Sequence, residues 1–183
     1  MADKVRYRTI DIVTPVMIAV AFGVIFIGLG ALFDALSPLW LLYKPTEGLF
    51  MGLWLLSGAV AGLIVRKPGA ALLAELLAAA IEMLLGGQWA DMTLVSGVLQ
   101  GLGMEISLAV WRYRRDGMRV AVVGGMIGAL FESVFERLYY YPMFRPTDTV
   151  FYMIFCLISG AVLAGVLGPV SYTHLRAHET RED

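Results

Sequence analysis

The sequence predicts an all-α membrane protein with six transmembrane helices, and three observations support this. Hydrophobic residues make up 59% of the 183-residue chain and charged residues only 16%, with a mean hydropathy of +0.76. Apolar runs recur at lengths close to the roughly 20 residues that a membrane-spanning helix needs. Short joints containing polar, glycine or proline residues separate the runs. The chain therefore has room for about six spans, and no separate soluble domain is expected.

The basic residues indicate how these spans are oriented. We expect the spans at residues 10–33, 47–65, 69–87, 92–111, 118–138 and 148–168. Nine basic residues belong to the N-terminus and the even-numbered joints: Lys4, Arg6, Arg8, Arg66, Lys67, Arg112, Arg114, Arg115 and Arg119. The odd-numbered joints and their edges carry three: Lys44, Arg137 and Arg145. The positive-inside rule therefore predicts that both termini are cytoplasmic.

The first span is too long for a signal peptide, and it contains two small residues, Ala19 and Gly23, spaced four apart. Small residues at this spacing let another helix approach closely in lipid. The neighbour is either a helix of the same bundle or a partner protein. After this span, the joint from Asp34 to Glu47 is unusually apolar for a loop. It either rests in the interfacial belt of the membrane or folds over an outward-facing cavity as a lid.

The third, fourth and fifth spans carry acidic and amide side chains at helical intervals. Glu75 and Glu82 are seven residues apart, so both lie on one face of the third span. Gln100 and Glu105 follow in the fourth span, and the fifth contains Glu132, with Glu136 one turn further on. An ionisable group at membrane depth costs several kcal/mol unless it faces protein or water. These side chains are therefore candidates for a functional site.

The expected depth in the membrane sorts these groups into two sets. Glu82, Gln100, Glu132 and Trp54 converge on the outer half of the bundle, with Trp89 and tyrosines such as Tyr140 above them. Carboxylates, an amide and aromatic faces suit a small aromatic cation. Glu75 and Glu105 belong to the inner half, where they either join helices or contribute to a site. Glu136 and Arg137 are expected to form an interfacial pair at the helix end.

Several classes of function lack the residues that they require. Residues 1–168 contain no histidine, and Cys156 is the single cysteine, which is expected to be a packing residue. Ser-His or Cys-His catalysis and a His/Cys metal site are therefore not expected. The chain also lacks a nucleotide-binding motif, so we expect no enzyme, no cofactor and no nucleic-acid binding. An intramembrane hydrolase would need a metal or histidine partner, whereas an assembly-only membrane subunit would not need converging carboxylates and aromatic rings.

The last residues, 169–183, are polar and without periodicity. They resemble the translated read-through of a transposon-type sequencing adapter, and we leave them out of the reasoning on the fold. The alternative is a native tail. Both histidines, His174 and His178, fall in this segment.

Two motifs carry a resemblance to a known family. The Lys-Pro-Gly-x5-Glu motif runs from Lys67 to Glu75, and the Gln-Gly-x3-Glu motif runs from Gln100 to Glu105. Together with the stretch from Ile81 to Gly86, they resemble the YkoE family, which are S components of energy-coupling factor (ECF) vitamin transporters. The resemblance implies a compact six-helix S-component bundle that captures thiamine, or its hydroxymethylpyrimidine precursor (HMP), near the outer surface. It also implies docking to an ECF transmembrane coupling subunit, with ATPase subunits supplying the energy.

The resemblance also assigns roles to residues. Glu82, Gln100 and Glu105 match the family's motif residues and become site candidates. Ala19 and Gly23 stand where such S components present small residues to the coupling subunit. The full set of expected substrate-binding residues is Glu82, Gln100, Glu105, Glu132, Trp54, Trp89 and Tyr140. The alternatives are an S component for another small vitamin and a structural membrane subunit.

Overall fold

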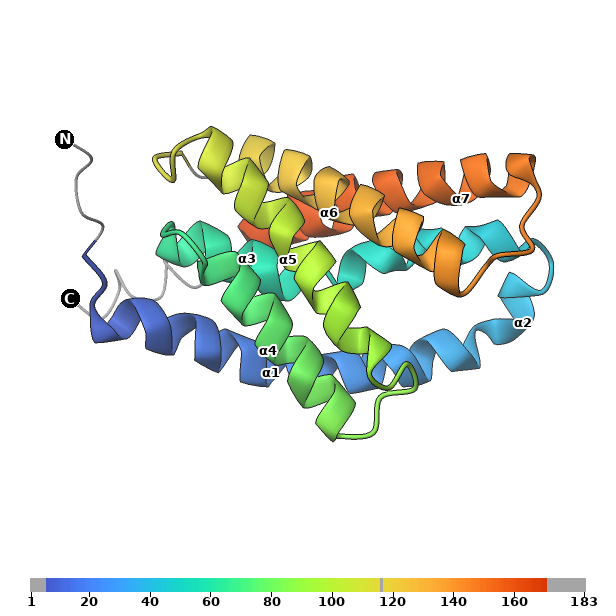
Figure 1. Cartoon of the computed structure of the whole chain (residues 1–183), viewed down its shortest axis with the longest axis horizontal. Helices are drawn as coiled ribbons and strands as arrows, with labels where there is room; N and C mark the ends of the chain where they lie inside the picture. The colour runs from blue at the N-terminus through green and yellow to red at the C-terminus, as the bar shows by residue number, and fades with distance from the viewer. Residues whose placement is uncertain (1–5, 116, 171–183) are drawn as a thin grey trace.

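The computed structural model describes residues 6–115 and 117–170, and every regular element in these residues is helical. The elements are α1 (Thr9–Ala35), α2 (Ser37–Trp40), η1 (Lys44–Leu49), η2 (Met51–Leu53), α3 (Leu56–Val65), α4 (Ala70–Leu84), α5 (Met92–Val110), α6 (Met118–Tyr139), α7 (Pro146–Ser159) and η3 (Gly160–Leu167). Figure 1 shows that they run back and forth along one long axis, so the start of α1 and the end of η3 lie toward the same end. The all-α prediction is confirmed.

Five stretches of the described chain are long and apolar enough to cross a membrane. They are Thr9–Ala35, Lys44–Val65, Met92–Val110, Met118–Tyr139 and Pro146–Val170. The remaining expected span, residues 69–87, is α4, which has only 15 residues. Such a helix rises about 22 Å, which is less than the roughly 30 Å of a hydrocarbon core. Gly69 and Gly86, with φ of +83° and +89°, flank α4. A sixth crossing and the side of the termini stay predictions.

Two of these stretches depart from α-helical geometry where they pack together. The second stretch begins with the 3₁₀ turns η1 and η2, and the last continues from α7 into the π-helical η3. Ser159 Oγ, at the start of this change, accepts a hydrogen bond from Gly52 N–H at 2.8 Å and donates one to Leu49 O at 2.7 Å. Gly52 has no room for a Cβ, because Ser159 lies directly against it. This close contact fixes the two irregular segments side by side.

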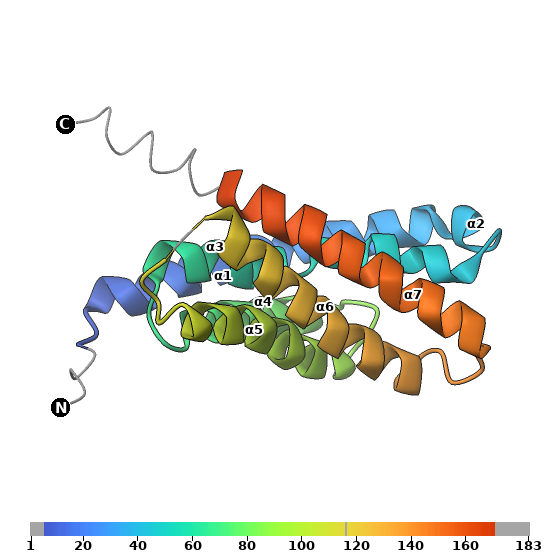
Figure 2. The ribbon, with the colours of Figure 1, turned by 90° about the horizontal axis from the view of Figure 1, so that it is seen from above.

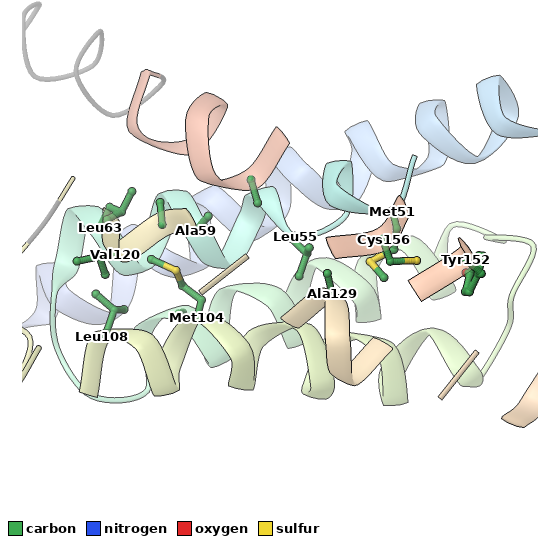
Figure 3. Packing of buried hydrophobic residues seen from close by; sticks show 13 residues of the cluster. Met51, Leu55, Ala59, Leu63, Met104, Leu108, Val120, Ala129, Tyr152 and Cys156 are labelled. Carbon is green, nitrogen blue, oxygen red and sulfur yellow. The ribbon is translucent and has the colours of Figure 1, made fainter. Parts of the chain in front are cut away.

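The main apolar core lies among α3, α5, α6 and the last segment of the described chain. Figure 3 shows its members spread along the bundle, from Leu63 and Leu108 at one end, past Leu55 and Ala129, to Cys156 and Tyr152 at the other. Cys156 is fully buried there, in agreement with the packing role expected for it. In Figure 2, α5, α6 and α7 follow one another across the bundle. The core therefore ties together α5 and α6, which carry Gln100 and Glu132.

The joint after α1 has an inward and an outward face. Trp40 Nε1 donates a hydrogen bond to Phe33 O at 3.0 Å, and the Trp40 ring packs on Phe33 and Phe50. Leu41 and Leu42, by contrast, are each 84% exposed. Exposed leucines beside an inward-facing tryptophan favour a position in the interfacial belt of the membrane.

The expected tail, residues 169–183, overlaps the described chain only at its start. Pro169 and Val170 continue the helix that follows η3. His174 and His178 lie outside the described residues.

Candidate functional site

A pocket rich in carboxylates lies inside the bundle. It holds about 680 Å³ of empty space, including the part that opens to solvent, and every long helical segment contributes to its wall. Five carboxyl side chains line it: Glu47, Glu75, Glu82, Glu132 and Glu136. Its other lining residues are Phe26, Phe33, Met51, Trp54, Ala79, Trp89, Thr93, Ser96, Gly97, Gln100, Tyr140, Tyr141 and Tyr152.

The structure brings together most of the side chains that the sequence suggested for substrate binding. Glu82 of α4, Gln100 of α5 and Glu132 of α6 line one cavity. Trp54, Trp89 and Tyr140 line the same cavity. The three polar residues come from three consecutive helices, α4, α5 and α6, and their role in substrate binding stays a prediction.

Glu82 lies beside an aromatic wall. The Glu82 side chain is 2% exposed, and Trp54 Nε1 lies 3.4 Å from Glu82 Oε1. The rings of Trp54 and Trp89 meet edge to face with centroids 5.2 Å apart. Phe33 lies against both indoles, with centroid separations of 6.2 and 5.9 Å. A carboxylate next to stacked aromatic faces provides both a counter-charge and a flat apolar surface.

Several buried polar atoms of the pocket have no hydrogen-bond partner among the described residues. They are Glu75 Oε1, Glu132 Oε2, Thr93 Oγ1 and Tyr140 Oη. A buried polar group without a partner costs free energy, so such atoms in a cavity are positions where a ligand donor or water is favoured. Burial raises the pKa of Tyr140 to about 12, and nearby Glu136 and Glu132 add to the effect. Its hydroxyl is therefore protonated at neutral pH and can donate a hydrogen bond.

Glu75 is buried and contributes both to a contact between helices and to the lining of the pocket. One carboxylate oxygen, Oε2, accepts a hydrogen bond from Gly58 N–H and thereby joins α4 to α3. The other, Oε1, has no partner, and the side chain lines the pocket. The two alternatives left open for Glu75, a helix contact and a part of the site, are thus both seen in its position.

Glu105 lies away from the pocket, unlike the other residues carried over from the family motif. Its carboxylate accepts hydrogen bonds from Gly69 N–H at 2.5 Å, from Leu72 N–H at 3.4 Å and from Tyr113 Oη at 2.7 Å. It therefore caps the N-terminus of α4, where free N–H groups favour an anion. Burial, followed by the hydrogen bond to Glu105, raises the pKa of Tyr113 well above its usual value. In this conformation Glu105 joins two helices and is not among the residues that line the pocket, and its assignment to substrate binding stays a prediction.

Ala19 and Gly23, expected at a docking surface, are buried against α4. Ala19 is 0% exposed. A Cβ on Gly23 would lie 2.6 Å from Ile81 Cβ and 3.0 Å from Ala78 O. In this conformation the small residues serve the contact between α1 and α4 inside the chain. Of the two alternatives stated for their neighbour, the structure supplies the internal helix.

Two further carboxylates of the pocket were not among the expected substrate-binding residues: Glu47, and Glu136, which was expected to pair with Arg137 at the helix end. Glu47 accepts hydrogen bonds from Lys44 Nζ and, at 2.5 Å, from Tyr141 Oη. Glu136 accepts one from Tyr152 Oη instead of pairing with the neighbouring arginine. That arginine, Arg137, donates to Thr149 Oγ1 and to the carbonyls of Tyr141 and Phe144. The four-residue spacing from Glu132 was the signal that could have placed Glu136 on the pocket face.

The acidic side chains are not arranged as a metal site. Within residues 6–115 and 117–170, no three His, Cys, Asp or Glu side chains converge in a way that could hold a metal ion. The carboxylates line different walls of the cavity, which suits a ligand larger than a single ion.

Comparison with known proteins identifies relatives of this chain. Residues 10–131 match the family described as "ABC-type cobalt transport system, permease component". The chain is 30% identical over 165 residues to YkoE of Bacillus subtilis (strain 168), a protein named for HMP/thiamine permease function; the match covers 88% of this chain and 81% of YkoE. A crystal structure of an S component of an ECF transporter superposes with a TM-score of 0.88 at 28% identity. That match covers 95% of this chain and 88% of the solved one.

Proposed function

Because this chain belongs to the YkoE family and has the fold of an ECF-transporter S component, we propose that it captures thiamine or HMP from the outer side of the membrane. The observation that carries the proposal is the pocket itself. It combines two buried carboxylates that each have one unpartnered oxygen with a wall of tryptophan and phenylalanine rings. The name of YkoE supports the choice of ligand.

The chemistry of thiamine matches this lining. Thiamine has a permanently charged thiazolium ring and a flat aminopyrimidine. A carboxylate such as Glu82 or Glu132 offsets the charge, and Gln100 offers both a donor and acceptors to the pyrimidine edge. Trp54 and Trp89 provide faces for stacking and for cation–π contact. HMP keeps the pyrimidine but lacks the thiazolium, so the two ligands use different parts of one site.

The alternatives explain the pocket less well. A structural subunit would need helix contacts but no acidic cavity with unpartnered oxygens, whose burial costs stability. An S component for another small vitamin fits the fold equally. The acidic lining then favours a cationic or donor-rich vitamin over an anionic one, since a buried carboxylate repels an anion.

The energy for transport comes, in this proposal, from partner subunits. An S component binds its ligand, while an ECF transmembrane coupling subunit and ATPase subunits drive the uptake. The sequence carries no nucleotide-binding motif, which supports this division of labour. The chain is therefore proposed to be a multi-pass protein of the prokaryotic cell membrane and not an enzyme.

A thermal-shift screen tests the proposal. A ligand that binds only the folded state raises the melting temperature in proportion to the logarithm of its concentration. Thiamine and HMP are expected to raise the melting temperature of the purified protein, whereas riboflavin, biotin and Co²⁺ are expected not to. A shift with another vitamin alone would reassign the ligand, and a shift with Co²⁺ alone would favour metal transport. If none of these compounds shifts the melting temperature, the assignment as a binder of these ligands fails.

A further inference from the structure

A second hollow lies outside the pocket, where α5 ends and α6 begins. It is lined by Trp111, Arg114, Arg115, Met118, Arg119 and Val120. In Figure 1 the connection between α5 and α6 lies toward the end of the bundle where α1 starts. This hollow plays no part in the proposed capture of thiamine.

The three arginines of the hollow are exposed and carry no counter-charge from the described chain. None of the ion pairs in residues 6–115 and 117–170 includes Arg114, Arg115 or Arg119. Guanidinium groups bind phosphate well because their planar N–H groups match its oxygens in pairs. Three such groups around one hollow therefore favour a phosphate-bearing ligand.

The backbone directly after α5 forms a defined turn at Arg112 and Tyr113. Arg112 and Tyr113 both adopt left-handed conformations, with φ of 55° and 57°. Arg112 N–H donates to Ala109 O and Tyr113 N–H to Leu108 O, each at 2.8 Å. Trp111 packs against the main apolar core and forms a fixed wall of the hollow. Arg114 and Arg115 thus follow a turn that is anchored to the core, and Arg119 lies in the first turn of α6.

The surroundings of the hollow are apolar as well as basic. Val110, the last residue of α5, is 68% exposed, and Met118, the first residue of α6, is 53% exposed. Both helices are long and apolar enough to span a membrane, so these side chains lie at the boundary between lipid tails and head groups. A ligand with a phosphate and an acyl chain satisfies both surfaces, whereas free phosphate satisfies only the basic one.

We propose that the hollow between α5 and α6 binds the head group of an anionic phospholipid. Arg114, Arg115 and Arg119 contact the phosphate, and an acyl chain lies along Val110 and Met118. Basic pockets at the ends of transmembrane helices attract such head groups, and each nearby basic residue adds to the attraction until salt screens it.

Native mass spectrometry of the purified protein tests this assignment. Phosphatidylglycerol and phosphatidylcholine with identical acyl chains are added in detergent at low salt. The wild-type protein is expected to retain phosphatidylglycerol about tenfold or more in preference. A variant carrying Arg114→Gln, Arg115→Gln and Arg119→Gln should lose most of this preference. The matched control, with Arg6→Gln, Arg8→Gln and Arg145→Gln, removes the same charge elsewhere and should keep it within about twofold.

A lysine variant and a competition with inorganic phosphate complete the experiment. Replacing the same three arginines of the hollow by lysine keeps the charge and should keep a preference for the anionic lipid, which separates charge from misfolding. Equal retention of both lipids by the wild-type protein would overturn the proposal, as would an unchanged preference in the glutamine variant. Displacement of the lipid by millimolar inorganic phosphate would identify a soluble phosphate site instead. If the wild-type protein shows no lipid preference and the glutamine variant no longer copurifies with ECF subunits, the proposal is overturned and the hollow is a contact for a protein partner. These readouts do not depend on thiamine binding.

Discussion

Individual carboxylates in this chain differ in their hydrogen-bond partners, and this difference suggests different roles for them. Glu47 and Glu136 accept hydrogen bonds from tyrosine hydroxyls, and Glu105 accepts them from backbone N–H groups. Glu132 keeps an unpartnered oxygen in the pocket, and Glu82 has a single long contact with Trp54. The carboxylates with free acceptor capacity are therefore the ones expected to bind ligand.

Replacing Glu82 or Glu132 by glutamine should show whether each carboxylate contacts the thiazolium or the pyrimidine of the ligand. A charge-assisted contact is worth roughly 1.5–3 kcal/mol, so Glu82→Gln should weaken thiamine binding by about 10- to 100-fold. If Glu82 pairs with the thiazolium, HMP affinity should stay nearly unchanged; if it reads the pyrimidine edge, both affinities should fall. Isothermal titration of both ligands against Glu82→Gln and Glu132→Gln measures this. Parental affinities in both variants would show that the site lies elsewhere.

The Glu105→Gln variant changes a carboxylate outside the pocket and serves as a comparison for the Glu82 and Glu132 variants. Because Glu105 caps α4 and contacts Tyr113 outside the pocket, its loss should affect folding more than binding. The expected cost is about 1–2 kcal/mol of stability, seen as a lower melting temperature, with thiamine affinity within about threefold of the parent. A large loss of affinity with an unchanged melting temperature would return Glu105 to the ligand site.

Glycines on α1 test how this helix packs. Gly23 lies against Ile81, whereas a Cβ on Gly28 would meet no atom within 4 Å. Gly23→Leu should therefore lower the melting temperature and ligand affinity together, since overpacking a helix contact costs about 1–3 kcal/mol or more. Gly28→Leu, on the same helix, should leave both unchanged. Normal affinity with abolished uptake in Gly23→Leu would instead support docking to the coupling subunit at this position.

Periodicity and depth predicted much of the arrangement, and the misses have physical reasons. Apolar runs of span length marked α1, α5 and α6 because long apolar helices leave a strong signal. The 3₁₀ turns before α3 and the π-helical η3 meet at a tertiary contact, Ser159 against Gly52, which no local sequence pattern encodes. Depth placed Glu82 and Glu132 together but could not reveal that Glu105 turns toward the end of α4. Small residues at a four-residue spacing indicate close approach without identifying the neighbour.

Considered as one body, the chain has an asymmetric distribution of charge that predicts its orientation. The arginine-rich connection between α5 and α6 lies at the end of the bundle where α1 starts. The pocket is lined instead by residues of α1, α4, α5, α6 and α7 and of the segment before α3. Reporter tags at the N-terminus and in the joint at residues 112–117 should therefore be cytoplasmic, and a tag near Pro45 should be external. An external N-terminus would reverse the depths assigned to the acidic residues.

The central claim is that one acidic and aromatic pocket binds thiamine and HMP, and equilibrium titration of the purified protein tests it most directly. The account predicts saturable one-to-one binding of each ligand, mutual competition, and at least about tenfold weaker thiamine binding in a Glu82→Gln/Glu132→Gln double variant that still folds. Absence of binding by the wild-type protein, or equal thiamine affinity in the double variant, would contradict it.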